Sequence, residues 1–182
     1  MTLLDDMACE VSFVRPAAEF RTAFLDAAEE YRNAGEELDP AFPGYRSTPF
    51  ERYVAQLEAV SQGRHLPLST VPAATFWLVR SDGRVLGASR LRYRLTTALA
   101  AEGGHIGYSI RPSERRKGYG TLLCALTIEE ARHTGQFSRL LITCDTNNTA
   151  SARIIEKNGG IFEDSVISQR TGRQVSRYWV TL

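Results

Sequence analysis

The stretch from His105 to Thr121 constrains the fold of this chain more than any other. It runs from an apolar segment through a basic turn at 115–117 to two glycines, Gly118 and Gly120, that open a long helical pattern. The first turn of a helix carries unpaired N–H groups and a partial positive charge. Glycines let a bulky anion approach that backbone closely, and the basic residues add full charges. The stretch therefore predicts a strand, a turn that binds a phosphate or pyrophosphate, and a helix.

The spacing of these glycines excludes the two commonest phosphate-binding loops. A P-loop requires Gly-x-x-x-x-Gly-Lys-Ser/Thr, and the sequence contains no such run. A dinucleotide-binding turn requires Gly-x-Gly-x-x-Gly, but Leu123 stands where the third glycine would be. What remains is Arg-x-x-Gly-x-Gly, from Arg115 to Gly120. Alone, this pattern also fits a basic helix N-terminus that binds no ligand.

Apolar periodicity and turn residues divide the chain into alternating strands and helices. Strands are expected at 11–14, 75–80, 84–95, 104–110, 139–144, 161–169 and 174–181, and helices at 17–33, 49–61, 118–133 and 149–157. Ser81-Asp82-Gly83 predicts a hairpin, residues 96–103 a loop, and Asn158-Gly159-Gly160 a helix end. This order predicts one α/β (α+β) domain over residues 1–182. Its sheet is expected to be mixed, mostly antiparallel and six- to seven-stranded, with helices on both faces.

The composition is typical of a soluble globular protein. Hydrophobic residues make up 43% of the chain and charged residues 24%, with a net charge of +1. A charge so near zero gives no support for a nucleic-acid partner. No apolar run approaches the roughly 20 residues that span a bilayer, so we expect no membrane partner.

The cysteines and the N-terminus favour a cytoplasmic protein. Cys9, Cys124 and Cys144 are widely spaced and show no paired-ligand pattern, which predicts reduced thiols and no metal site. The first residues include Asp5 and Asp6, whereas a secretory signal would begin with basic residues.

A second motif follows the strand expected at 139–144. Residues 148–151 read Asn-Thr-Ala-Ser, and residues 156–159 read Glu-Lys-Asn-Gly. Together with Arg-x-x-Gly-x-Gly, this motif resembles the GNAT-type N-acetyltransferases, in particular a little-characterised bacterial branch of predicted acetyltransferases. The close resemblance covers residues 85–162, and the order of strands extends it over most of the chain.

The resemblance implies that acetyl-coenzyme A is the cosubstrate. The backbone of the strand at 108–110 would pair with the pantetheine arm, and the amides at 116–121 would bind the pyrophosphate. Arg116 or Lys117 would lie near the adenosine phosphates, and Asn148 would position the pantetheine or act only as a helix N-cap. The full set of implied cofactor-binding residues is Tyr108, Ser109, Ile110, Arg115, Arg116, Lys117, Gly118, Tyr119, Gly120, Thr121, Asn148 and Ser151.

The chemistry of amine acetylation requires a base. An amine with a pKa near 10.4 is protonated at neutral pH, and its deprotonation costs roughly 4–5 kcal/mol. Some relatives carry a glutamate five residues before the asparagine, where this chain has Thr143. His105 and Glu102 are therefore the candidate bases, and a route through water is the alternative.

The departing thiolate benefits from an acid. Many family members use a tyrosine seven residues after the asparagine, and this chain has Ile155 there. Tyr178 or Tyr108 would have to substitute for it.

These features predict an N-acetyltransferase that moves the acetyl group directly to a primary amine in a ternary complex. The missing tyrosine keeps a non-catalytic acyl-coenzyme A-binding or sensing domain as the alternative, and a binder of another nucleotide phosphate is a second. The acceptor would be a small molecule or a peptide, and the protein a monomer or homodimer. The acidic residues Glu29, Glu30, Glu36, Glu37 and Asp39 could favour a cationic amine or form a solvated helix surface.

Overall fold

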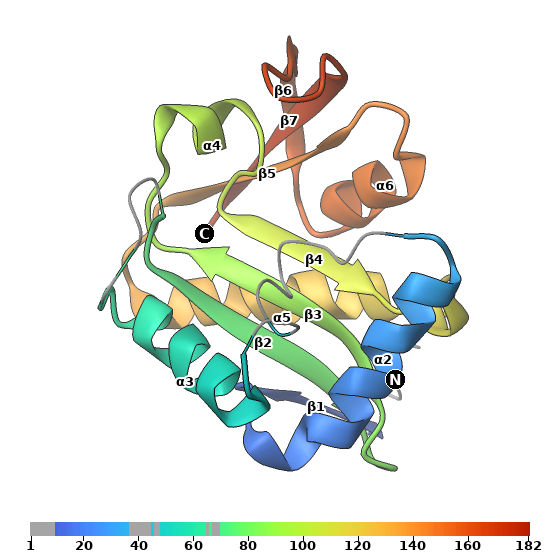
Figure 1. Ribbon diagram of the computed structural model, residues 1–182. Coiled ribbons are helices and arrows are strands. Elements are labelled where there is room, and N and C mark those ends of the chain that lie inside the picture. The colour runs from blue at the N-terminus through green and yellow to red at the C-terminus, as the bar shows by residue number, and fades with distance from the viewer. Residues whose placement is uncertain (1–9, 37–44, 46–47, 65, 67–69) are drawn as a thin grey trace.

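A seven-stranded sheet forms the centre of the molecule (Figure 1). The computed structural model describes residues 10–36, 45, 48–64, 66 and 70–182. The strand order is β1-β2-β3-β4-β5-β7-β6, and among the described strands only β4 and β5 pair in parallel. The strands are β1 (Val11–Val14), β2 (Ala73–Arg80), β3 (Val85–Arg92), β4 (Ile106–Ile110), β5 (Arg139–Asp145), β6 (Ile161–Ile167) and β7 (Gln174–Thr181). The predicted mixed, mostly antiparallel sheet is confirmed.

Helices cover both faces of the sheet. They are η1 (Ala18–Phe20), α2 (Arg21–Asn33), α3 (Phe50–Ser61), α4 (Thr97–Ala101), η2 (Pro112–Glu114), α5 (Tyr119–Thr134) and α6 (Thr149–Lys157). In Figure 1, α2 and α3 lie in front of the sheet and α5 runs behind it. No described helix is long and apolar enough to cross a membrane.

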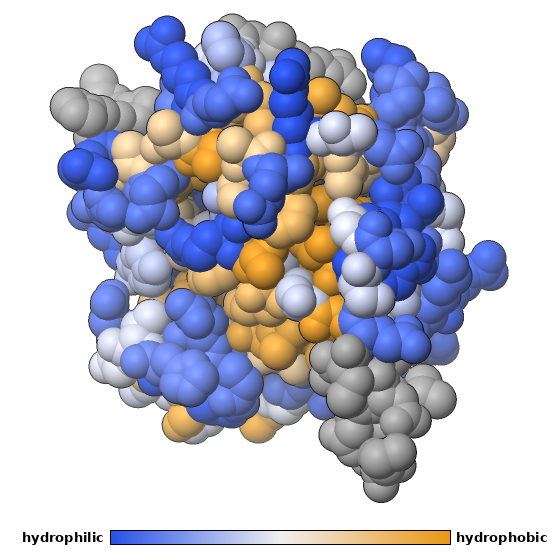
Figure 2. Space-filling model, turned by 90° about the horizontal axis from the view of Figure 1, so that it is seen from below, coloured by the Kyte–Doolittle hydropathy of each residue, from blue (hydrophilic) through white to orange (hydrophobic). Residues whose placement is uncertain are grey.

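Successive side chains of β2 point to opposite faces of the sheet and pack into the hydrophobic clusters on each face. Trp77 points to the α2–α3 side, where its ring stacks on Phe24 with centroids 4.9 Å apart. Its neighbours Phe76 and Leu78 belong to the clusters on the α5 side. Because both faces are buried, β2 is apolar at nearly every position rather than at alternate ones. On the face shown in Figure 2, hydrophilic residues frame a band of apolar residues.

The prediction missed the α-helix α4 and the short 3-10 helix η2. Residues 96–103 were expected to form a loop, but α4 occupies Thr97–Ala101. The Thr96 hydroxyl caps this helix by accepting the Leu99 N–H at 3.2 Å. Five residues are too few to show helical periodicity in the sequence.

The parallel pairing between β4 and β5 is confined to one end of the strands. The registered pair is Ile106 with Ile142, and no later residues of the two strands are paired. On its other edge β4 is paired with β3 as far as Ile110, and on its other edge β5 is paired with β7 as far as Asp145. The two strands therefore separate toward their carboxyl ends. This opening positions the candidate site.

Candidate active site

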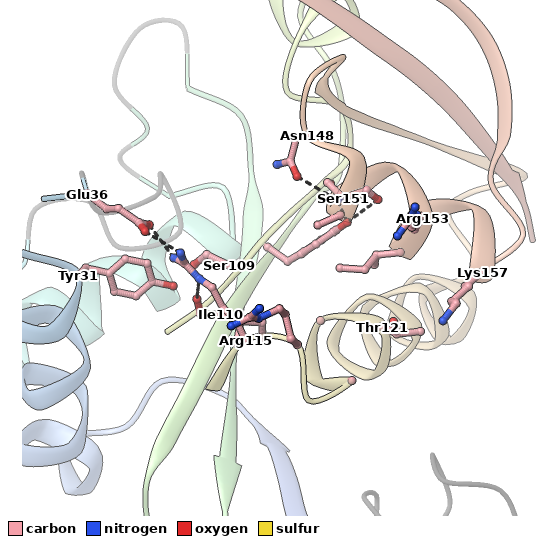
Figure 3. Close-up of a pocket in the computed structure, with 16 residues that line it drawn as sticks. Tyr31, Glu36, Ser109, Ile110, Arg115, Thr121, Asn148, Ser151, Arg153 and Lys157 are labelled. Carbon is pink, nitrogen blue, oxygen red and sulfur yellow. Dashed lines mark hydrogen bonds and ion pairs between the residues drawn. The ribbon is translucent and has the colours of Figure 1, made fainter. Parts of the chain in front are cut away.

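A cavity of about 830 Å³ lies where β4 and β5 separate (Figure 3). This volume is sufficient for a cofactor-sized ligand. Its walls come from β4, the turn after it, the first turn of α5, the whole length of α6, and the end of α2 with the residues just after it. The lining residues are Tyr31, Glu36, Tyr108, Ser109, Ile110, Arg115, Arg116, Gly118, Gly120, Thr121, Asn148, Ala150, Ser151, Arg153, Ile154 and Lys157.

The turn before α5 presents backbone N–H groups to this cavity. Arg116 has a φ of 61° and Gly118 a φ of 92°, which is the left-handed region. The N–H groups of Thr121 and Leu122 both donate to the Gly118 carbonyl, whereas within the described chain those at 116–120 donate to no backbone carbonyl. Concave runs of such groups at a helix N-terminus bind anions. Local geometry therefore fits the anion-binding turn that the sequence predicts.

Two residues of the predicted set turn their side chains elsewhere. The Lys117 ammonium lies 2.9 Å from the buried carboxylate of Glu114. The Tyr119 ring is buried against Leu78 and Leu86 on the α5 face of the sheet. Neither residue lines the cavity.

The Arg115 side chain is engaged in hydrogen bonds within the chain, which fix the turn before α5. Its two terminal nitrogens each lie 2.6 Å from an oxygen of Glu36, and its Nε donates to the Ile110 carbonyl at 2.9 Å. The guanidinium also lies 5.7 Å from the centre of the Tyr31 ring. Hydrogen bonds from Arg115 lower the pKa of Glu36. The Ile110 carbonyl, implied as a pantetheine partner, is therefore already bonded within the chain.

Sequence reasoning did not place Tyr31 or Glu36 at the cavity. Glu36 was noted only as a member of an acidic segment, of which Glu37 and Asp39 lie outside the described residues. Glu30 of the same segment is bonded to the buried Arg111 rather than to the cavity.

Helix α6 and the residue that caps it form the opposite wall of the cavity. Asn148 caps the helix, because its Oδ1 accepts the Ser151 N–H at 3.0 Å, and it also lines the cavity. The Tyr108 hydroxyl lies 2.9 Å from the Ser151 hydroxyl. Burial raises the pKa of Tyr108, so its phenol stays protonated at neutral pH. Arg153 and Lys157 also line this wall, and the prediction did not include them.

None of the three candidate catalytic residues lines the cavity. Glu102 pairs with Arg170 at 3.2 Å. Tyr178 is buried in the core and packs edge-on against Phe162. His105 uses its Nδ1 to accept the Leu141 N–H at 2.8 Å. Their catalytic roles remain predictions, and this geometry gives them no support.

The environment of His105 favours a neutral imidazole. Burial and the nearby Arg92 lower its pKa to about 4, although the Leu141 N–H opposes them. With Nδ1 accepting a hydrogen bond, the proton of the neutral ring lies on Nε2. The ring therefore has no free basic nitrogen to accept a proton from an amine.

We expect His105→Asn to change acid stability rather than the pH dependence of catalysis. Below its unfolded pKa of about 6.5, His105 is charged only in the unfolded chain, so stability falls as pH drops toward 4. Asparagine can accept the Leu141 N–H without titrating. The free energy of unfolding in urea should therefore decline less in the variant between pH 7 and 4.5. The pH profile of kcat/KM should be unchanged, whereas loss of its acidic limb, which reports an essential base, would establish His105 as the base.

The position of the usual acid is buried in this chain. Ile155 belongs to the core between α6 and the sheet, while its neighbour Ile154 lines the cavity. Thr143, where some relatives carry a glutamate, accepts the Gly103 N–H at 2.8 Å. No group of His, Cys, Asp or Glu among the described residues is arranged to hold a metal ion.

Comparison with known proteins agrees with the geometry. The model of the acetyltransferase (GNAT) domain family matches residues 22–161. RimL, a ribosomal L7/L12 alpha-N-protein acetyltransferase solved with coenzyme A, is 14% identical with a TM-score of 0.67, over 95% of this chain and 94% of that chain. YncA from Salmonella typhimurium, solved with its cofactor acetyl-CoA, is 16% identical with a TM-score of 0.62, over 95% and 94%. No curated protein matches the sequence.

A third structure has the same fold. The microcin C7 self immunity acetyltransferase MccE, solved with acetyl-CoA and AMP, is 16% identical with a TM-score of 0.66, over 95% of this chain and 93% of that chain. At these identities the solved structures establish the fold alone. The family model, which spans most of the chain, establishes the family. The chain belongs to the GNAT acetyltransferases, as its two sequence motifs predicted.

Proposed function

We propose that this acetyl-coenzyme A-dependent N-acetyltransferase transfers the acetyl group directly to a primary amine while both substrates occupy the one cavity. The observation that carries the proposal is that residues from both faces of the sheet line the cavity. Tyr108 points to the α5–α6 side, where it meets Ser151. Ser109, the next residue along β4, points to the side of α2, from which Tyr31 and Glu36 come. Because residues from both faces of the sheet line the cavity, acetyl-coenzyme A and the acceptor amine can enter it from opposite sides at the same time.

The residues present fit coenzyme A on the α5–α6 side. The unpaired N–H groups at 116–120 and the positive end of α5 suit a pyrophosphate. The edge of β4 beyond Ile106 is not paired with β5, and the register with β3 leaves the backbone groups of Tyr108 and the N–H of Ile110 on that edge, where they can bond an extended amide chain. When bound, acetyl-coenzyme A supplies a thioester that is reactive toward amines.

Tyr108 is our proposed proton donor to the departing sulfur. It lies in the cavity wall, and its hydroxyl is 2.9 Å from the Ser151 hydroxyl. Burial raises its pKa, which keeps the phenol protonated but also makes it a weak acid, so the proposal rests on its position. On the acceptor side, Glu36 is held by Arg115 with a lowered pKa, which makes it a weak base. We therefore favour loss of the amine proton through water.

The cysteines support direct transfer over an acyl-cysteine intermediate. Burial raises the pKa of the Cys144 thiol, and it raises the pKa of Cys124 to about 12. Both are therefore thiols at neutral pH, whereas the thiolate is the nucleophile. Cys9 lies outside the described residues. Free thiols accord with a cytoplasmic protein, and we propose a small-molecule or peptide amine as acceptor and a monomer or homodimer as the active form.

Initial-rate kinetics test this proposal. We expect release of coenzyme A thiol with at least one member of a broad amine panel, and intersecting lines when both substrates are varied. Cys144→Ala should retain kcat within about threefold, because the thiol does not react. Parallel lines together with inactivity of this variant would instead indicate an acyl-cysteine. Binding without turnover across the panel would favour a sensing domain, and tighter binding of ATP than of coenzyme A would refute the assignment.

A further inference from the structure

Two cations on α6 face the cavity without an acidic partner. Arg153 and Lys157 line the cavity, and no ion pair or hydrogen bond within the described chain involves either side chain. Two of the three basic residues of the neighbouring turn differ, because Arg115 is bonded to Glu36 and Lys117 to Glu114. The α6 cations are thus available to an anionic ligand.

The packing of α6 brings these charges close to the start of α5. The Asn158 Nδ2 donates to the Thr121 carbonyl at 3.2 Å. A Cβ built on Gly120 would lie 2.8 Å from the Ile154 side chain, so the two helices are in close contact there. Arg153 and Lys157 are four residues apart and therefore share a side of α6, which lines the cavity next to the side, Ile154 and Asn158, that contacts α5 (Figure 3).

The anion-binding turn does not need these two cations. Its free amides, the helix dipole and Arg116 already suit a pyrophosphate. Two like charges at this spacing on a helix repel each other unless an anion lies between them. Coenzyme A carries one more phosphate, the 3′-monoester of its ribose, with a charge of about −1.5 to −2 at pH 7.

We infer that Arg153 and Lys157 bind the 3′-phosphate of coenzyme A, so that this chain discriminates coenzyme A from dephospho-coenzyme A. The inference rests on the proposed use of acetyl-coenzyme A at this cavity. Arg153 supplies a planar fork for two phosphate oxygens, and Lys157 supplies a compact charge from the adjacent turn of the helix.

Isothermal titration calorimetry with the two nucleotides tests the inference without any acceptor amine. Wild-type protein should bind coenzyme A about tenfold or more tightly than dephospho-coenzyme A. In the Arg153→Gln, Lys157→Gln double variant this ratio should fall to about one, because affinity for dephospho-coenzyme A changes less than about twofold. Arg153→Lys with Lys157→Arg should restore most of the preference, since both charges return.

Arg52→Gln provides the matched control, because it removes an exposed arginine on α3 that does not line the cavity. It should leave both affinities and their ratio unchanged. Equal binding of the two nucleotides by wild-type protein would overturn the inference alone. An equal loss of both affinities in the double variant would do the same, since the cations would then serve the pyrophosphate. Failure to bind either nucleotide would overturn the proposed function as well.

Discussion

Replacing Gly120 by glutamate is expected to weaken coenzyme A binding at least about a hundredfold while leaving the fold intact. Gly120 lies in the first turn of α5 and lines the cavity. A carboxylate there meets the pyrophosphate directly, and two unit charges about 4 Å apart near a protein surface repel by about 4 kcal/mol. Even half of that energy is a factor of about thirty in affinity, to which the added bulk contributes further. Titration calorimetry measures the loss, and far-ultraviolet circular dichroism checks the fold.

Two variants at the same position separate charge from bulk. Gly120→Gln has nearly the size of glutamate without the charge, so it should retain an intermediate affinity. Gly120→Ala should be tolerated best, because its Cβ crowds the flexible far end of the Ile154 side chain, at 2.8 Å, and meets Ile110 at an ordinary contact distance of 3.7 Å. A folded Gly120→Glu protein that binds coenzyme A normally would show that the pyrophosphate does not lie at this turn.

The order of the elements was predictable because its signals are local. Gly83 at a hairpin and Gly159 at a helix end have positive φ values, as their turns require. The ends of strands were less predictable: β3 was expected to reach residue 95 and ends at Arg92, and β6 was expected to reach 169 and ends at Ile167. A strand ends where its hydrogen-bonded pairing with neighbouring strands ends. That pairing depends on the neighbours, so it cannot be predicted from the sequence of the strand alone.

The same distinction applies to the site. The anion-binding turn is contiguous in sequence, so its glycines and basic residues predicted it directly. Tyr31 and Glu36 reach the cavity only because α2 packs across β3, the neighbour of β4, which no local pattern reveals. Arg153 and Lys157 are four residues apart in the helix that begins after Asn148. This spacing could have predicted that both cations lie on the same face of α6.

His105 shows that closeness to a motif in sequence differs from closeness to the cavity in space. Its place just before β4 brought it near the motif in sequence, yet the cavity opens at the other end of that strand. Proximity along a strand of five residues is therefore a poor guide to proximity at a site.

Replacing Arg111 by methionine is expected to destabilise the protein by about 2–3 kcal/mol. Arg111 is 1% exposed, and its guanidinium bonds Asp26 at 2.8 Å, Glu30 at 2.6 Å and the Val85 carbonyl. Methionine fills a similar volume but leaves these acceptors without their donor. Removing one partner of a buried pair costs about 3–5 kcal/mol, and the partial exposure of Glu30 and Asp26 reduces that cost. Urea unfolding monitored by circular dichroism measures the difference.

The pH dependence of this loss distinguishes a broken ion pair from poor packing. Burial raises the pKa of Glu30, but the Ser113 N–H and Arg111 together lower it below the ordinary value. A lowered folded pKa adds stability above the unfolded pKa of about 4.5, and this stability is lost as pH falls through the folded value. The destabilisation by Arg111→Met should therefore shrink below pH 4.5, whereas a packing defect would persist. Arg132→Met, which removes an exposed pair with Glu129, should cost less than about 0.5 kcal/mol at any pH.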